Sequence, residues 1–216
     1  ALAGGILLAL IGIVAATVAG VLVDAARRLP RNGFGLVGGA VPGDEPALTP
    51  WLHERLQQCA GRTASEPPVT FGDLADAGIR LRVMTTNLTQ RRPMVLPFDT
   101  EQFWFDPVRW RELFGAEIVD HLLAHPPALP TNPEEAFESR VRRAQTALAP
   151  LPDPRDLPIV VATRLSLSFP FLMSAVPLHG VDWADRTNQD AARALTEWRR
   201  AHPDAMPEEA AADPAL

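Results

Sequence analysis

Lysine is absent from this chain, and cysteine occurs only once. All twenty basic residues are arginine, against 26 acidic residues, so the net charge is −6. This negative charge disfavours nucleic acid as a partner, because a phosphate backbone repels it. The single Cys59 excludes an internal disulfide and is compatible with a reducing, cytoplasmic compartment.

Charge is also absent from the first 23 residues. An apolar run of roughly 20 residues can cross the hydrocarbon core of a bilayer. Arg27, Arg28 and Arg31 follow it, which predicts that the later residues lie on the cytoplasmic side. The sequence therefore predicts a helix at 1–23 that projects from the rest of the chain and associates with a membrane. The alternative is a helix buried in the fold of a cytoplasmic protein.

Two later segments have the patterns of sheet structure. Residues 159–162 form a short, β-branched run after a proline, which predicts a strand covered on both faces and followed by a helix. Residues 79–98 alternate apolar and polar side chains and turn at 90–93, which predicts two consecutive strands. We expect both segments in one sheet, with Arg80 and Arg82 on its less buried side.

Together these two segments resemble the patatin-like phospholipase family, which has a strand ending in a Thr-Thr-Asn-Leu-Thr-like sequence and a later Arg-x-Ser-x-Ser-x-Pro-like helix start. The matching residues are Met84 to Thr89 and Arg164 to Pro170. The connecting elements of bacterial members are similar to residues 33–35, 48–52, 69–74 and 103–107. The resemblance implies an α/β fold, a three-layer α/β/α sandwich with a mixed sheet, incomplete at both ends.

The catalytic parts of that family are missing from this sequence. Its acyl hydrolases use a serine in a Gly-x-Ser-x-Gly elbow and an aspartate in a later Asp-Gly pair. None of the serines here has glycine two residues away on both sides, and no aspartate precedes a glycine. The resemblance therefore implies that the Ser-Asp dyad lies outside this segment. No catalytic, cofactor-binding or metal-binding residue is assigned within it.

The predicted function rests on the resemblance. We expect a fragment of a patatin-like lipid acyl hydrolase whose whole form cleaves carboxylic esters of phospholipids or related lipids, while the segment alone is inactive. Its expected partners are a lipid or membrane surface and the remainder of the parent domain, without a metal or organic cofactor. The alternative is a non-enzymatic, membrane-anchored interaction module with a patatin-like fold.

Short motifs elsewhere in the chain are too weak to assign a site. Residues 33–38 match a dinucleotide fingerprint, but they follow an arginine-rich helix end rather than a strand. His121 and His125 have the spacing of zinc ligands beside Asp120, yet no third ligand cluster accompanies them. His53 precedes a glutamate but lacks the second histidine of a zinc protease motif.

Three polar residues near the second matching segment are expected to be structural. Ser166 and Ser168 have no positioned base to activate them, and the nearest histidine in sequence, His179, has no evident orienting partner. Both serines are predicted to cap a helix. Arg164 lies among apolar residues, so it either sits near the acyl-ester site or pairs with a buried carboxylate, and the structural role is favoured.

Apolar spacing predicts further helices at 50–61 and 107–125, and a charged helix at 134–148 as a solvent-facing or lid-like cover. After residue 181 the composition shifts to alanine, proline and acidic residues, with one helix expected at 190–202 and disorder from 203 onward. The predicted organisation is a hydrophobic helix at 1–23, a patatin-like central part at 24–180 and a partly disordered tail at 181–216.

Overall fold

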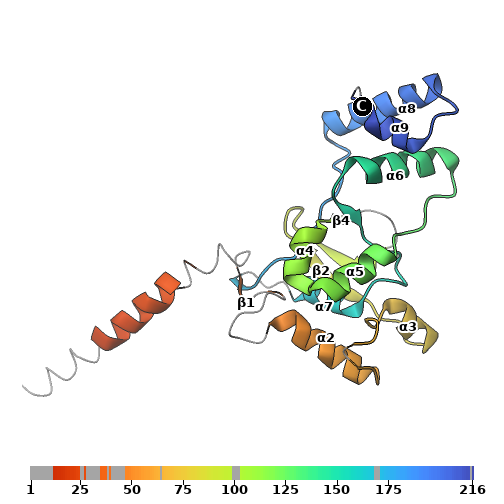
Figure 1. Cartoon of the computed structure of the whole chain (residues 1–216). Helices are drawn as coiled ribbons and strands as arrows, with labels where there is room; N and C mark the ends of the chain where they lie inside the picture. The colour runs from red at the N-terminus through yellow and green to blue at the C-terminus, as the bar shows by residue number, and fades with distance from the viewer. Residues whose placement is uncertain are drawn as a thin grey trace, which may run out of the picture.

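The computed structural model describes residues 12–24, 27, 35–37, 39, 47–63, 65–98, 103–167, 171–214 and 216. Besides a helix at 12–24, the helices are Leu48–Cys59 (α2), Phe71–Asp76 (α3), Pro107–Phe114 (α4), Ala116–Ala124 (α5), Pro133–Gln145 (α6), Ile159–Ser166 (α7), Arg186–Ala201 (α8) and Pro207–Ala212 (α9). The strands are Gly35–Val37 (β1), Val83–Asn87 (β2), Arg92–Leu96 (β3), Trp104–Phe105 (β4), Ala149–Pro150 (β5) and Phe171–Met173 (β6). The chain thus mixes helices with small sheets, as the predicted α/β class requires (Figure 1).

The strands pair two by two. β1 pairs with β6 in parallel, whereas β2 with β3 and β4 with β5 are antiparallel. Across the described ranges these are three separate two-stranded sheets, and the single mixed sheet of the predicted sandwich does not appear among them. The coarse class is therefore supported, while a three-layer sandwich would need strands beyond these ranges.

The predicted hairpin is confirmed as β2 and β3, although its first strand begins later than expected. Residues 79–82 lie outside the strand, and both Arg80 and Arg82 are exposed. The hairpin packs on α7, where the Thr85 hydroxyl donates a hydrogen bond to the Leu165 carbonyl at 2.7 Å. This contact brings together the two segments that the sequence predicts as neighbours, though not as strands of one sheet.

The predicted strand at 159–162 is wrong, because these residues form the first part of α7. Pro158 has an extended backbone and precedes the helix, and Ile159, Val160, Val161 and Ala162 are all buried. A short apolar run satisfies either a buried strand or a buried helix, and periodicity alone does not separate them. α7 is enclosed by neighbouring elements, so its sequence lacks the polar face that marks a surface helix.

The helix predicted at 107–125 is two helices. Asp106 caps α4 by accepting from the amides of Val108 and Arg109, with Pro107 at the first helical position. Gly115, with φ of 84°, then ends α4 and begins α5. The positive φ is readily available to glycine, so the two short helices can turn their apolar faces toward the same core.

The C-terminal helices form a second, small core. It contains Phe137 and Val141 of α6 and Ala210 of α9, against which Trp198 of α8 packs. The Trp198 indole also donates to the Asp213 carboxylate at 2.7 Å. In Figure 1 the helix α6 lies beside α9, so one of its faces is covered. The disorder predicted from residue 203 onward is wrong for α9, whose helical turn buries Ala210.

Candidate functional site

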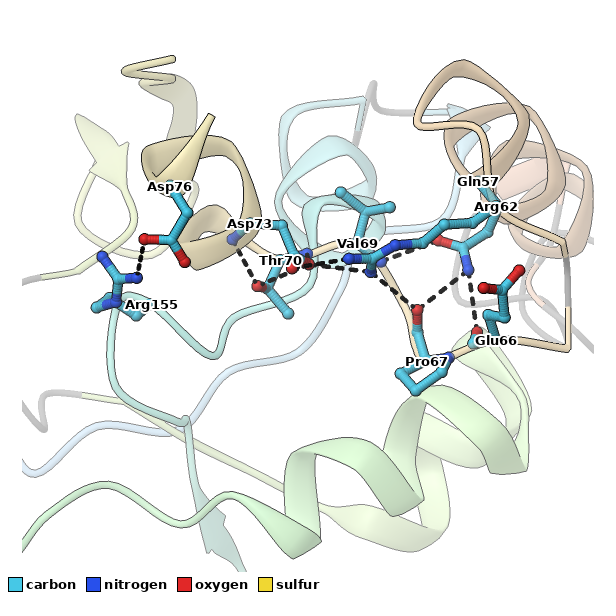
Figure 2. Close-up of polar contacts among 9 residues, drawn as sticks. All are labelled: Gln57, Arg62, Glu66, Pro67, Val69, Thr70, Asp73, Asp76 and Arg155. Carbon is cyan, nitrogen blue, oxygen red and sulfur yellow. Dashed lines mark hydrogen bonds and ion pairs between the residues drawn. The ribbon is translucent and has the colours of Figure 1, made fainter. Parts of the chain in front are cut away.

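Gln57 of α2 organises the loop that joins α2 to α3 (Figure 2). Its side chain is fully buried. The amide nitrogen Nε2 donates to the carbonyl oxygens of Thr63 at 3.2 Å, Glu66 at 3.0 Å and Pro67 at 3.1 Å. The amide oxygen Oε1 accepts from the Val69 backbone N–H at 2.9 Å. One side chain thus replaces the backbone partners that an irregular segment cannot supply for itself.

An ion pair closes the other side of this loop. The Arg62 guanidinium donates to both carboxylate oxygens of Asp73, at 3.1 and 2.8 Å. Asp73 also forms a capping box with Thr70 at the start of α3. The hydrogen bond from Arg62 holds the pKa of the Asp73 carboxyl below its usual value, despite the opposing effect of burial. Every oxygen of Asp73 is therefore committed to holding the loop.

The same region is fixed to the segment before α7. The Gly72 amide donates to the Arg155 carbonyl at 2.7 Å, and a Cβ at Gly72 would lie 2.8 Å from that oxygen. Glycine is required here by the close approach of two backbones. On the surface, Arg155 pairs with Asp76 at 2.6 Å (Figure 2). These interactions make a structural clamp between α3 and α7, and they leave no side chain arranged for catalysis.

Arg164 is buried in the middle of the molecule, on α7. Its Nε donates to the Thr49 hydroxyl at 3.3 Å and its Nη2 to the Ser174 hydroxyl at 3.2 Å. Thr49 in turn donates to the Leu113 carbonyl at 2.7 Å. Burial lowers the pKa of the Arg164 guanidinium. Arg164 therefore ties α7 to α2 and to the residue after β6, which supports the predicted structural role. It does so from a helix and not from a strand end, and these two contacts are made to hydroxyl groups rather than to the expected carboxylate.

The serines singled out by the sequence do not form a nucleophile site in the described residues. Ser166 lies exposed at the C-terminal end of α7, whereas the prediction has it capping a helix that begins after it. Beyond Leu167, the next described residues, Phe171–Met173, form β6, so that prediction is wrong. No hydrogen bond in the described part of the chain joins its hydroxyl to a histidine or a carboxylate. Ser168 lies outside the described residues. His179 is exposed and pairs with Trp104 through its backbone alone.

We expect the chain by itself not to hydrolyse p-nitrophenyl butyrate above the rate in buffer, because the residues that the structure describes contain neither an activated serine nor a positioned base. The measurement is the release of nitrophenolate at neutral pH, with Ser166→Ala and Ser168→Ala as matched variants. All three proteins should be indistinguishable from buffer. A turnover that either alanine variant abolishes would contradict the absence of a nucleophile.

His121 and His125 stack on one face of α5, with ring centroids 4.3 Å apart. His121 Nε2 lies 3.0 Å from the Asp156 carbonyl, and His125 Nδ1 lies 2.8 Å from the His121 carbonyl. Asp120 pairs with Arg111 instead of facing the rings. No group of three His, Cys, Asp or Glu side chains within the described ranges could hold a metal ion. The two histidines therefore have a packing role at the C-terminal end of α5.

His121 should make stability depend on pH. Burial is the largest effect on its pKa and lowers it below the usual histidine value, so the folded chain resists protonation more than the unfolded chain does. The unfolded state then binds more protons as the pH falls below about 6.5, and the unfolding free energy decreases. Urea titrations between neutral and mildly acidic pH should show this decrease. His121→Gln should flatten the dependence, whereas His179→Gln, at an exposed position, should leave it unchanged.

The helix at 12–24 carries its apolar side chains into solvent. All of its described side chains are exposed, among them Ile13, Val14, Val18, Val21, Leu22 and Val23. Figure 1 shows it standing apart from the other elements. The predicted helix is thus confirmed over 12–24, and the part of that prediction at 1–11 falls outside the described residues.

No helix among the described residues is long and apolar enough to cross a membrane. This finding corrects the predicted transmembrane helix and the membrane-associated localisation that rested on it. Over the residues that the structure describes, this helix extends from 12 to 24, which is shorter than the roughly 20 residues that a span requires.

A second exposed apolar surface lies on the hairpin. Met84 of β2 stands opposite Val95 of β3, and Thr86 stands opposite Pro93. All four are exposed, whereas Val83, Thr85 and Met94 on the other side of the ladder are half-buried. Sequence reasoning missed this surface and the role of Gln57. The signals were an arginine-rich, acid-free segment at 77–98 and a glutamine on the apolar side of a helix.

No protein-family model matches the chain, and no solved structure matches it. It is 40% identical over 171 residues to the RpoH suppressor of Rhizobium meliloti (strain 1021), a match that covers 71% of this chain and 25% of that protein. The chain thus spans about a quarter of the length of this relative. The comparison corrects the terms phospholipase, hydrolase and lipid degradation, since the matching relative is named a suppressor of RpoH and not a lipid hydrolase.

Proposed function

We propose that this chain is a non-catalytic section of a longer RpoH suppressor-like protein, in which the helix at 12–24 seats against protein supplied by the remainder. The observation that carries the proposal is the complete exposure of that apolar helix. The relative to which the chain is similar is about four times as long as the matching segment, so a protein of that kind has further chain to cover the helix.

The energetics of the helix support a protein neighbour. Burying one large aliphatic side chain stabilises by roughly 1.5–3 kcal/mol, so covering its six exposed valine, isoleucine and leucine side chains would contribute on the order of 10 kcal/mol. Nothing lies within 4 Å of a Cβ built at Gly12 or Gly20. These small residues would let a packed helix or sheet approach the helix backbone closely.

The parallel pair of β1 and β6 gives further support. Parallel strands are usually covered on both faces and belong to larger sheets, whereas this pair stands by itself among the described residues. We propose that strands from the remainder complete it, which would give the three-layer α/β/α sandwich that the sequence led us to expect. The helix at 12–24 precedes β1 in the chain, so one layer of protein from the remainder could cover both the helix and the β1–β6 pair.

Catalysis is not part of this proposal. The Ser-Asp acyl hydrolase that the resemblance implied for the whole protein stays a prediction, because neither group is assigned in this chain. The name of the relative suggests instead that the longer protein acts in suppression of RpoH. For the present chain we propose a structural contribution to that activity.

A hybrid protein tests the proposal. This chain would replace the matching segment of the Rhizobium meliloti protein, and amide hydrogen exchange at 12–24 would be compared between the hybrid and the chain alone. Exchange should be slower in the hybrid, and the hybrid should still suppress RpoH. Val18→Asp with Val21→Asp should abolish the protection, because two buried carboxylates would lack partners. Equal exchange in hybrid and isolated chain would refute the seating of this helix.

A further inference from the structure

The outer face of the β2–β3 hairpin combines an apolar centre with arginines at its two ends. Met84 is 64% exposed and stands opposite Val95, which is 45% exposed. Leu88 in the turn is 54% exposed. Arg80 precedes the hairpin and Arg91 lies in its turn, whereas Arg92, the register partner of Asn87, belongs to the other side of the ladder. Hereafter this surface is named the hairpin face.

The charge of the hairpin opposes that of the rest of the chain. Residues 77–98 contain four arginines and no acidic residue, while the whole chain has a net charge of −6. Removing these four positive charges leaves −10 on all the other residues. Within the described part of the chain, no ion pair engages Arg80, Arg91 or Arg92. The hairpin face is therefore a local positive surface on an acidic protein.

We propose that the hairpin face docks an acidic, amphipathic segment of a partner protein. Its glutamate or aspartate side chains would pair with the arginines, and its apolar side chains would cover Met84 and Val95. Charge complementarity identifies the occupant. This inference rests on the hairpin alone and is independent of the seating of the helix at 12–24.

A short acidic segment fits better than an extended polyanion. Nucleic acid and an anionic bilayer are both larger than the hairpin and would bring negative charge near the −10 on the rest of the chain, which repels it. A segment that covers only the hairpin avoids most of that repulsion. Pro93 in β3 has no N–H to donate, which disfavours lengthening the sheet along that strand and favours contact with the face.

Fluorescence anisotropy with a defined probe tests the proposal on the full chain. The probe is a fluorescein-labelled peptide of about 14 residues with glutamate and leucine at helical spacing, compared with the same peptide carrying lysine for glutamate. The acidic peptide should bind, and its affinity should fall with added salt. It should bind about tenfold less tightly to the double variant Arg80→Glu with Arg91→Glu. Met84→Ser should weaken it as well, through the lost apolar contact.

The control is Arg140→Glu with Arg200→Glu, which changes the net charge equally at exposed positions of α6 and α8. This control variant should bind the acidic peptide with an affinity within about twofold of that of the unchanged chain. Equal weakening by the control pair would show general attraction and overturn the proposal, as would equal binding of the lysine peptide. Arginine-dependent binding of a single-stranded oligonucleotide or of phosphatidylglycerol vesicles, without binding of the acidic peptide, would also overturn it. Circular dichroism of each variant establishes that it is folded.

Discussion

Trp110→Ala should destabilise the chain by about 3–5 kcal/mol, the range for removing a large aromatic side chain from a core. Trp110 is completely buried between Phe105 and Phe114, with ring centroids 4.6 and 4.8 Å away. Its indole N–H donates to the Pro177 carbonyl at 2.9 Å. The substitution therefore leaves a cavity, removes two aromatic contacts and leaves the partly buried Pro177 carbonyl without its hydrogen-bond donor.

Urea unfolding followed by circular dichroism measures this effect. Val108→Ala is the matched control, because Val108 lies on the same helix, two residues earlier, and is 73% exposed. It should change the unfolding free energy by no more than about 0.5 kcal/mol. A loss below about 1 kcal/mol for Trp110→Ala would mean that the core around α4 collapses onto the space without penalty.

The position of Trp110 could be predicted from the sequence, since the spacing of Leu113, Phe114, Ile118 and Leu122 after it marks one helical face. All of them are buried, as expected. The break at Gly115 could not be predicted, because an isolated glycine is tolerated inside many helices. The break is set by the direction that α5 must take to pack on the core, and this direction depends on elements that are distant in sequence.

The error at residues 159–162 has a similar origin. Valine and isoleucine favour strands only weakly, and packing overrides such a preference. Here α7 contacts both β2 and α2, and all four residues of the run are buried within the helix. The prediction of disorder after 203 failed for another reason. The segment after 203 contains few large apolar residues, which is typical of disorder. The small side chain of Ala210 is nevertheless sufficient to pack against Phe137 and Val141.

The interaction surfaces were visible in the sequence only as unexplained patterns. The apolar run at 1–23 predicted a helix that must be covered, and the cover expected from the sequence was a membrane. The four arginines near Thr85 and Thr86 lay within a segment explained as a strand pair. Which of its faces is open depends on α7, since α7 covers the alternate residues and leaves Met84 and Val95 exposed. That choice is made by tertiary contact, which a period of two residues cannot supply.

Gln57→Leu should lower the unfolding free energy by about 3 kcal/mol, although leucine nearly preserves the side-chain volume. The change removes the acceptor of the buried Val69 amide and the shared donor of three loop carbonyls. A buried amide without a partner retains its full desolvation penalty, which is about 1–3 kcal/mol. The apolar leucine would also lie against those carbonyls, so the loop would have to open to reach water.

The adjacent residue provides the control. Gln58 lies on the exposed side of α2, and within the described residues its side chain forms hydrogen bonds only with Glu54 and Arg55. Gln58→Leu should therefore cost less than about 0.5 kcal/mol. Amide exchange separates the local effect from the global one. Gln57→Leu should increase the exchange rate of the Val69 amide more than that of the Ile118 amide, each compared with the same amide in the unchanged chain. If the Val69 amide stays as protected as before, another group holds this loop, and the ion pair between Arg62 and Asp73 is sufficient without Gln57.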